Sequence, residues 1–466
     1  MRTFLFYDIE TTGLSHSFDQ IVQFAAIRTD MDFMVLEQHD ITVALRKDIR
    51  PNPEAILVTK LDLKDYEGEY TEYEAVREIH KLFNKPGTIS IGYNTLGFDD
   101  EFIRFNFYRN LLDMYSHQFR DNCSRADILY MLIFYFLYRK DFIKWPQDNE
   151  GKYSMKLEKI SELNQFATGM AHDALVDVKA TVALAERMKS DDSLWKYCLA
   201  NYDKKTDKER TNSFWKDHLG IQIALYLDLR RGSALGYQTP VTYLGENSFQ
   251  QGLMLALDRL DFASLSEEEL FSSQLIIRKK WGEPGFIVPY AKRTQEHYDA
   301  ERLQLIARNA VWLVDNSNEF HQLKEYWQNY TYPVVEEADI DTRLYMDGFW
   351  SAADKNICRS FHFADTCEEK RDVLANVSNP NILELGKRLI YRNYSQQELG
   401  LSLSDDADKF FKKFARNEML DYRGIARKSF EEIVQEYEDK MSQELDSTNF
   451  ELLRNALNVL KSYTVS

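Results

Sequence analysis

An apolar run near the start of the chain, residues 4–13, carries two carboxylates two positions apart, Asp8 and Glu10. Such a run predicts a buried strand, and strand side chains alternate with a period of two, so both carboxylates point to one face. Two like charges at the end of a buried strand are costly unless a cation lies between them. The pair therefore indicates a metal site, with a solvated strand edge as the common alternative for an isolated pair.

Two more acidic residues lie at positions that suit the same chemistry. Residues 88–94 predict a short strand, and Asp99 follows it at the expected N-terminus of a helix. Taken alone, Asp99 is explained more simply as a helix cap. Asp177 lies inside a predicted helix with apolar neighbours on both sides, where a bound cation would explain the charge. His172, just before that helix, is either a catalytic residue or a helix-start residue bonded to the backbone.

Length and composition limit the class of protein. A chain of 466 residues exceeds what one hydrophobic core normally serves, so about three domains are expected. The N-terminus leads directly into the first strand, which leaves no room for a signal peptide, and the most apolar run, residues 128–138, is too short to span a bilayer. The cysteines have no metal-binding spacing, which argues against a zinc site and a disulfide framework and fits a reducing compartment. They are Cys123, Cys198, Cys358 and Cys367. We expect a cytoplasmic protein without a membrane anchor.

The first part of the chain alternates strands and helices. Strands are expected at residues 21–28 and 40–45, and Thr71 and Glu74 form a predicted capping box for a helix that ends near residue 83. This order predicts an α/β domain with a central mixed sheet.

The rest of the chain divides into two further units. A charged run at residues 203–210 marks a boundary zone, and a helix is expected near residues 214–229. Short strands then indicate a small α+β domain with β-barrel character. These strands are expected at residues 240–244, 253–257, 275–278 and 286–288. From about residue 345 onward the apolar spacing predicts helices alone.

The order of the acidic motifs is more specific than any one of them. D-x-E, then N-x3-F-D, then H-x4-D resembles the three motifs of the DEDDh superfamily, the histidine-containing 3′→5′ exonucleases. A narrower resemblance is to the bacterial exonuclease I family, and it is dense from residue 3 to about residue 188. The segments that carry it are residues 92–94, 98–101, 107–110, 121–125, 145–146 and 347–351.

The resemblance implies a fold and an activity. Residues 1–190 are expected to form a ribonuclease H-like exonuclease domain, residues 191–343 an SH3-like α+β domain and residues 344–466 an all-α C-terminal domain. The implied function is processive 3′→5′ degradation of single-stranded DNA, releasing nucleoside 5′-monophosphates in DNA repair and recombination. The second and third domains are expected to close around the strand.

The resemblance and the chemistry together assign roles to the five motif residues. Asp8 and Asp177 are expected to bind the metal ion that activates water, and Asp8 and Glu10 the ion at the leaving oxygen. Asp99 is expected to act through water or from a second layer, and His172 as the general base. Glu10 is also expected to contact the substrate. Oxygen ligands without thiolates favour two Mg²⁺ ions, with Mn²⁺ as the alternative.

The net charge of −17 would repel nucleic acid, so binding to DNA requires a local basic track. Its candidate residues are Arg104, Arg125 and Arg139, each with a solvated face as the simpler alternative. Lys156 occupies a position where the family is expected to carry an arginine that contacts the substrate. A lysine keeps the charge but loses the bidentate fork.

The resemblance also implies a protein partner. The exonuclease I family binds the acidic C-terminal tail of the single-stranded DNA-binding protein, and the chain is expected to be a monomer. Basic residues that could serve the tail are Lys279, Lys280, Lys292 and Arg293.

Two other functions remain open at this point. One is a ribonuclease or oligoribonuclease of the same superfamily, although such enzymes are usually single-domain chains. The other is a nucleic-acid-binding protein that has lost the chemistry, against which the presence of all five motif residues argues.

Overall fold

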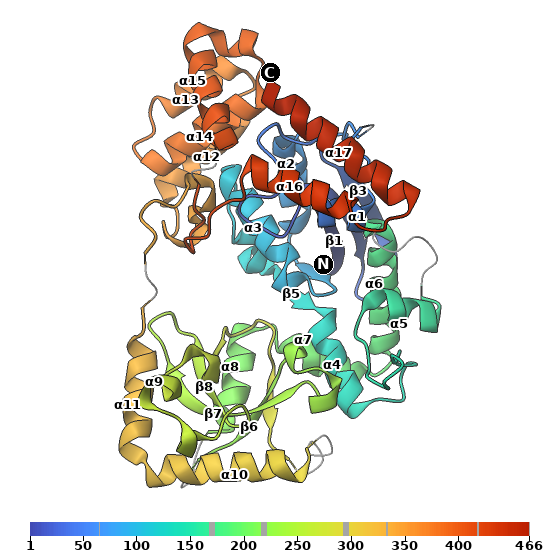
Figure 1. The fold of residues 1–466 in the computed structure, drawn as a ribbon, viewed down its shortest axis with the longest axis vertical. Coiled ribbons are helices and arrows are strands. Elements are labelled where there is room, and N and C mark those ends of the chain that lie inside the picture. Colours follow the sequence, from blue (N-terminus) through green and yellow to red (C-terminus); the bar gives the residue numbers. More distant parts are fainter. Residues whose placement is uncertain are drawn as a thin grey trace.

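The computed structural model describes residues 1–64, 66–166, 173–215, 221–291, 298–331, 334–416 and 419–465. Its first region is built on a five-stranded mixed sheet in the order β3-β2-β1-β4-β5 (Figure 1). The strands are β1 (Thr3–Thr11), β2 (Ile21–Thr29), β3 (Val35–Thr42), β4 (Thr88–Gly92) and β5 (Ser124–Asp127). β1 pairs with β2 in antiparallel and with β4 in parallel orientation, which confirms the predicted mixed sheet.

Helices cover both faces of this sheet. On one face, Phe4 and Phe6 of β1 belong to the same core as α4 (Ile128–Tyr138) and α6 (Ala174–Lys189). On the other face, Leu5 and Tyr7 belong to the core that includes α2 (Glu72–Phe83) and α3 (Asp99–Arg109). Because β1 is buried on both sides, its few polar positions lie at the end of the strand, where the acidic motif is.

Local capping explains where these helices begin. Thr71 and Glu74 form the predicted capping box of α2. Asp127 accepts a hydrogen bond from the Leu129 N–H at the start of α4, so the apolar run becomes a buried helix. Three shorter helices complete this part of the chain. They are α1 (Pro53–Thr59), α5 (Leu157–Asn164) and α7 (Asp192–Ala200).

The second region contains an antiparallel sheet in the order β10-β6-β7-β8-β9. Its strands are β6 (Ala224–Leu227), β7 (Gln238–Glu246), β8 (Gly252–Ala256), β9 (Ile276–Lys279) and β10 (Ile287–Pro289). The helices around it are α8 (Lys204–Ser213), α9 (Glu267–Leu270), α10 (Ala300–Asp315) and α11 (Ser317–Asn329). The four strands expected from the sequence are all present.

The prediction of a helix near residues 214–229 is wrong for the residues of this stretch that the structure describes. Residues 224–227 form β6, which is fully buried and pairs with β7 and β10, so tertiary pairing outweighs the local pattern. The helix of this stretch, α8, lies earlier, in the charged run, where Asp203 caps it by accepting from the Thr206 N–H. The strand expected at residues 40–45 is also shifted, because β3 begins at Val35 and pairs with β2 along its length.

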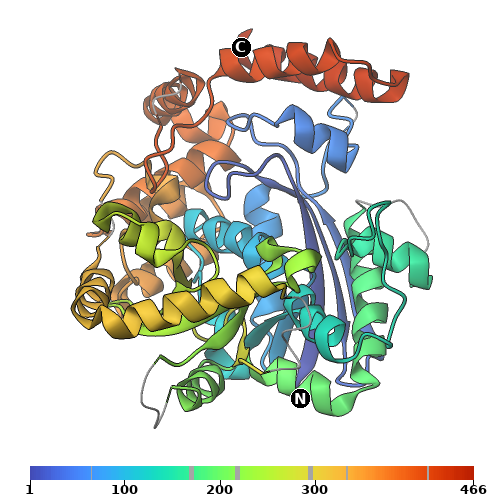
Figure 2. The ribbon, with the colours of Figure 1, turned by 60° about the horizontal axis from the view of Figure 1, so that its bottom comes forward.

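The third region is helical, as expected. Its helices are α12 (Ala352–Phe363), α13 (Cys367–Leu374), α14 (Pro380–Asn393), α15 (Gln396–Arg416), α16 (Phe430–Met441) and α17 (Ser447–Val465). Figures 1 and 2 show α12–α15 grouped together, whereas α17 extends across the exonuclease-like sheet region. Ile433 of α16 and Leu453 of α17 share a core with Ile56 of α1, so the end of the chain returns to its beginning.

Two further expectations concern cysteines and membranes. All four cysteines are free and buried, which agrees with the absence of a disulfide framework among them. Within the described residues, none of the helices has the length and apolar character that a membrane crossing requires. The domain boundaries after residues 190 and 343 remain predictions.

Candidate active site

Three carboxylates from two elements meet at the end of β1. Asp8 and Glu10 come from β1, and Asp177 comes from the first turn of α6. One oxygen of each lies within 4.8 Å of one oxygen of the others. A register shift between Glu10 and Thr11 ends the regular pairing of β1 with β2 at this point. The packing of α6 on β1 therefore brings together the three predicted metal ligands, although Asp177 lies 169 positions after Asp8 and 167 after Glu10 in the sequence.

The electrostatics of this cluster favour a cation. Burial raises the pKa of Glu10 to about 9, and the carboxylates of Asp8, Asp177 and Asp173 add to the shift. Burial also raises the pKa of Asp8 well above its usual range, together with Asp99 and Asp177. The strongest influences on both residues in the described part of the chain are thus burial and other acids. Closely spaced carboxylate oxygens whose charges repel one another fit a hard divalent cation.

Asp99 adds a fourth carboxylate beside this cluster. It is the first residue of α3 and is buried, and the N-cap position before it is Phe98, which has no side-chain cap. Its Oδ1 accepts a hydrogen bond of 3.1 Å from the Ile9 N–H of β1. Burial raises its pKa, and hydrogen bonds from its own N–H and from the Ile9 N–H partly oppose the rise. Asp99 therefore joins the start of α3 to β1, and its placement suits the predicted supporting role.

His172 lies outside the described residues, which resume at residue 173. Asp173 begins α6 by accepting hydrogen bonds from the Leu175 and Val176 N–H groups. The role of His172 as a general base stays a sequence prediction.

Arg104 and Arg125, two of the predicted DNA contacts, are engaged inside the protein. Arg104 Nε lies 3.0 Å from Asp100 Oδ2, and Arg125 NH1 lies 2.5 Å from the same oxygen. Burial raises the pKa of Asp100, but the two guanidinium groups outweigh it and hold that pKa well below its usual range. The observed contacts of both arginines are therefore structural, and their contact with DNA stays a prediction.

The other two predicted DNA contacts lie at the surface. Lys156, at the start of α5, has an exposed side chain with its Nζ 3.5 Å from a Glu158 carboxylate oxygen. Arg139 follows α4 and pairs with Asp191, and its Nε is 3.5 Å from Asp141. To bind DNA, Lys156 and Arg139 would each have to give up these carboxylate partners for a phosphate.

The residues suggested for the acidic partner tail differ in accessibility. Lys279 is fully buried, with its Nζ 2.7 Å from Asp207 Oδ2, so its proposed contact with the tail is wrong. Its buried position in β9 gives the physical reason, because the ion pair already neutralises it. Lys280 is about half exposed, and Lys292 and Arg293 lie outside the described residues.

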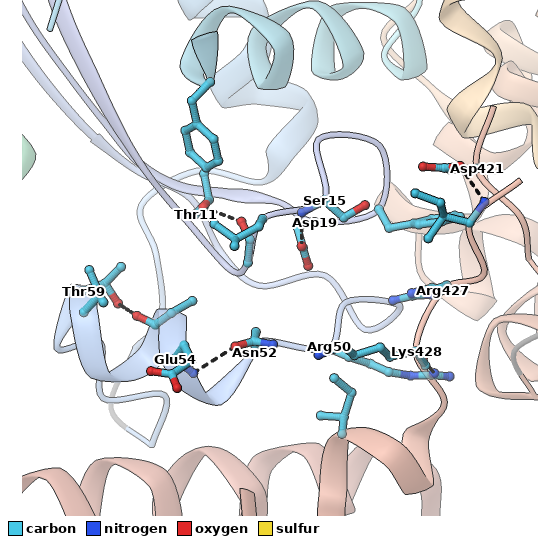
Figure 3. Close-up of a pocket in the computed structure, with 18 of the residues that line it drawn as sticks. Thr11, Ser15, Asp19, Arg50, Asn52, Glu54, Thr59, Asp421, Arg427 and Lys428 are labelled. Carbon is cyan, nitrogen blue, oxygen red and sulfur yellow. Dashed lines mark hydrogen bonds between the residues drawn. The ribbon is translucent and has the colours of Figure 1, made fainter. Parts of the chain in front are cut away.

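A cavity of about 800 Å³ adjoins Glu10 (Figure 3). Its walls come from the end of β1, from α1 and from residues 421–428 of the helical region. Arg50 and Arg427 line it, and the Arg50 guanidinium donates a 2.9 Å hydrogen bond to the Lys428 carbonyl oxygen. Arg50 and Arg427 are 377 positions apart, and because no local pattern relates them, neither arginine was predicted as part of the site.

Comparison with known proteins identifies the family. The model described as Exonuclease matches residues 5–185, and the model described as Exonuclease I C-terminal domain matches residues 338–463. The chain belongs to the exonuclease I family. The family prediction and the predicted fold class are both confirmed.

Individual relatives of the family agree with this assignment. The Exodeoxyribonuclease I of Escherichia coli is 38% identical over 191 residues, which cover 40% of each chain. The Exodeoxyribonuclease I of Buchnera aphidicola from Schizaphis graminum is 26% identical over 416 residues, covering 84% of this chain and 83% of the relative.

Solved structures extend the likeness of the fold over the whole chain. A crystal structure of E. coli Exonuclease I with a dA16 oligonucleotide has a TM-score of 0.84 at 23% identity, covering 99% of this chain and 100% of that one. An Exonuclease I from Methylocaldum szegediense has a TM-score of 0.84 at 24% identity, with the same coverage.

Proposed function

We propose that this protein is an exodeoxyribonuclease that degrades single-stranded DNA processively in the 3′→5′ direction and releases nucleoside 5′-monophosphates. The observation that carries the proposal is the cluster of Asp8, Glu10 and Asp177 at the end of β1. Relatives named Exodeoxyribonuclease I, and structures of E. coli Exonuclease I with dA16 and dT13 oligonucleotides, support the substrate class.

The carboxylate cluster provides the ligands for divalent cations. We assign Asp8 and Asp177 to one ion and Asp8 and Glu10 to the other, with Mg²⁺ as the physiological metal and Mn²⁺ as its substitute. Bound there, two cations would supply positive charge for the attacking and leaving oxygens of phosphodiester hydrolysis. Asp99 holds the β1 backbone at Ile9 and so fixes the strand that presents Asp8 and Glu10.

The protein also supplies a base and substrate contacts. His172 is assigned to take the proton from the attacking water, a role worth about 10²- to 10⁴-fold in rate. Glu10 contacts the terminal nucleotide, and Lys156 and Arg139 are assigned to phosphates further along the strand. Because phosphate contacts release counterions, binding should weaken steeply with salt.

We further propose that the protein is a cytoplasmic monomer that acts in DNA repair and recombination. A solved structure of the single-stranded DNA-binding protein with Exonuclease I and an inhibitor supports a contact between this chain and the acidic tail of that partner. Lys280 is a surface candidate for that contact.

One assay tests the proposed function. Purified protein is incubated with end-labelled single-stranded DNA, blunt duplex DNA and RNA, each with Mg²⁺ and with chelator. We expect nucleotide release from single-stranded DNA alone, from a free 3′ end and only with the cation. Release from RNA at an equal rate would favour the ribonuclease of the same superfamily, and no release at all would favour a binding protein without catalysis.

A further inference from the structure

Asp127, the last residue of β5, is a fully buried carboxylate outside the metal cluster. It lies opposite Gly92 of the neighbouring strand β4. Burial raises its pKa to about 6, and the main groups that oppose the rise are backbone N–H groups, with no basic side chain among them. A buried carboxylate is costly unless it is hydrogen-bonded, so these backbone contacts are what keeps Asp127 in place.

The two carboxylate oxygens of Asp127 bind two different elements. Oδ1 accepts a 3.0 Å hydrogen bond from the Leu129 N–H and so caps α4. The same oxygen accepts from the Asn94 N–H at 3.0 Å, and Oδ2 accepts from the Leu96 N–H at 3.0 Å. A helix cap needs only one side-chain oxygen, which serine also provides. The remaining contacts hold the turn of residues 93–98, which links β4 to α3.

This turn is packed closely beside β1. Its first constrained residue, Asn94, has a left-handed backbone with φ 65° and ψ 18°, a conformation that asparagine adopts more readily than most residues. A Cβ atom at Gly92 would lie 2.2 Å from Thr95 Cγ2 and 2.6 Å from the Tyr7 carbonyl oxygen. The turn and β1 therefore both approach Gly92 closely, and Tyr7 is the residue before the metal ligand Asp8.

The turn leads directly into Asp99, which joins α3 to β1. Asp99 Oδ1 accepts the 3.1 Å hydrogen bond from the N–H of Ile9, the residue between Asp8 and Glu10. A shift of the turn would move Asp99 and, through this bond, the backbone that carries two metal ligands. Loss of an outer partner that orients the ligands of a metal typically costs about 10- to 100-fold in metal affinity or activity.

We propose that Asp127 is a positioning residue for the metal site: it fixes the turn of residues 93–98 and so places Asp99 against the strand that carries Asp8 and Glu10. Its effect on the reaction rests on the proposed function, whereas its effect on cation binding is measured without any reaction. Asp127 acts through Asp99 and the backbone.

Two variants of Asp127 separate its contacts with the turn from its capping of α4 and from its charge. Asp127→Ser keeps a hydroxyl that can cap α4 but is too short to bridge to the turn. Asp127→Asn keeps one oxygen for the Asn94 and Leu129 N–H groups and loses the Leu96 contact. Both remove the charge, so a difference between them comes from the contacts. The control is Asn309→Ala in α10, since Asn309 is also buried and bonds three backbone groups, within the second region.

Mn²⁺ affinity by calorimetry and steady-state nucleotide release are measured for each protein. We expect Asp127→Ser to bind Mn²⁺ about tenfold more weakly or worse and to lose about tenfold or more in kcat. Its KM for single-stranded DNA should stay within about threefold, because the geometry of the reacting groups changes and the strand contacts do not. Asp127→Asn should lose about threefold in affinity and kcat. Asn309→Ala should lower the free energy of unfolding but leave both quantities within about twofold.

The two measurements separate this inference from the proposed function. If Asp127→Ser loses only stability, as the control does, the inference is overturned and the proposed function stands. Equal losses in Asp127→Ser and Asp127→Asn would assign the effect to the charge and would also overturn it. If wild type releases no nucleotide, the proposed function fails and the Mn²⁺ affinities decide the inference, and if wild type binds no Mn²⁺, both fail. If Asp127→Ser does not fold, the Mn²⁺ affinity of Asp127→Asn against wild type decides it.

Discussion

Two groups of buried carboxylates in this protein have opposite properties. In the cluster at the end of β1, burial and neighbouring acids raise the pKa of Glu10 to about 9. In the network between the first and the helical regions, burial also raises the pKa of Asp48 and Asp341, but arginines outweigh it and hold both well below their usual range. Arg392 NH2 lies 3.0 Å from Asp48 Oδ2 and also pairs with Asp341.

The difference separates structural from catalytic acids. The network supplies its own positive charge, from Arg392, Arg46 and Arg388, and thereby joins residue 48 to residues 339–392. After burial, the influences that raise the pKa of Asp8 and Glu10 in the described residues come from other acids, and a bound cation would offset them. Burial alone does not distinguish the two groups, whereas the sign of the nearest charge does.

Removal of a cluster acid should have the largest effect, on activity. Asp177→Ala deletes a ligand of the ion assigned to activate water, so we expect nuclease activity on single-stranded DNA to fall by at least about 10³-fold, the scale of metal-ion stabilisation of developing charge. Steady-state nucleotide release with Mg²⁺ measures it. Retention of a tenth of the wild-type rate would make the metal assignment wrong.

Removal of an arginine from the network should instead lower the free energy of unfolding. Arg392→Ala leaves Asp48 and Asp341 buried without their shared partner, which should cost about 3–5 kcal/mol in free energy of unfolding. Denaturant titration measures this cost. Arg423→Ala is the control, since the Arg423 side chain is half exposed and its loss should cost less than about 1 kcal/mol. Equal losses in the two variants would contradict the distinction drawn here.

Acid should weaken the same interface through His362 of α12. Its Nδ1 lies 2.9 Å from the Tyr73 hydroxyl, its Nε2 lies 3.0 Å from the Leu111 carbonyl oxygen, and burial lowers its pKa to about 4. Because the folded pKa lies below the unfolded value of about 6.5, the unfolded chain binds the extra proton, and stability is lost as pH falls from about 6.5 toward 4. His362 should contribute a loss of about 2 kcal/mol at pH 5.

Denaturant titrations at pH 7 and pH 5 test this contribution. His362→Gln keeps a hydrogen-bonding side chain but cannot take up a proton in this range, so it should show a smaller loss between the two pH values. The same loss in the variant as in wild type would place the responsible group elsewhere.

The smallest effect is expected for Arg139, whose charge is already paired at the surface. Arg139→Ala should reduce processivity on long single-stranded DNA by about twofold to fivefold and lower the salt dependence, because one phosphate contact is lost. Hydrolysis of a very short oligonucleotide should stay nearly unchanged. Equal losses on long and short substrates would remove Arg139 from the DNA track.

The sequence predicts those parts of the fold that local patterns determine. The bounds of α4 follow from its apolar run and the Asp127 cap, and the shared face of Asp8 and Glu10 follows from strand periodicity. The apolar neighbours of Asp177 in its helix predicted that this residue binds a cation. The packing of α6 on β1 then brings it to Asp8 and Glu10. These features depend on short segments of the sequence and on the order of the acidic motifs along the chain.

Partners that are distant in the sequence determine the remainder. The sequence shows that Arg104 and Arg125 are positively charged but not where their side chains lie. Both pair with the buried carboxylate of Asp100 and not with solvent. The expected helix near residues 214–229 gives way to β6 because two other strands pair with it. The meeting of Arg50 with Arg427 likewise requires α16 and α17 to fold back on α1.

The central claim, that the carboxylate cluster at the end of β1 binds divalent cations, is tested most directly by unfolding with and without cation. Wild type and Asp177→Asn are treated with chelator and then unfolded without cation or with Mg²⁺ or Mn²⁺. Wild type should gain about 3 kcal/mol of unfolding free energy at 100 times the dissociation constant. Asp177→Asn should be at least as stable as wild type without cation, because repulsion is relieved, and should gain far less when cation is added. An equal gain in both proteins would contradict the claim.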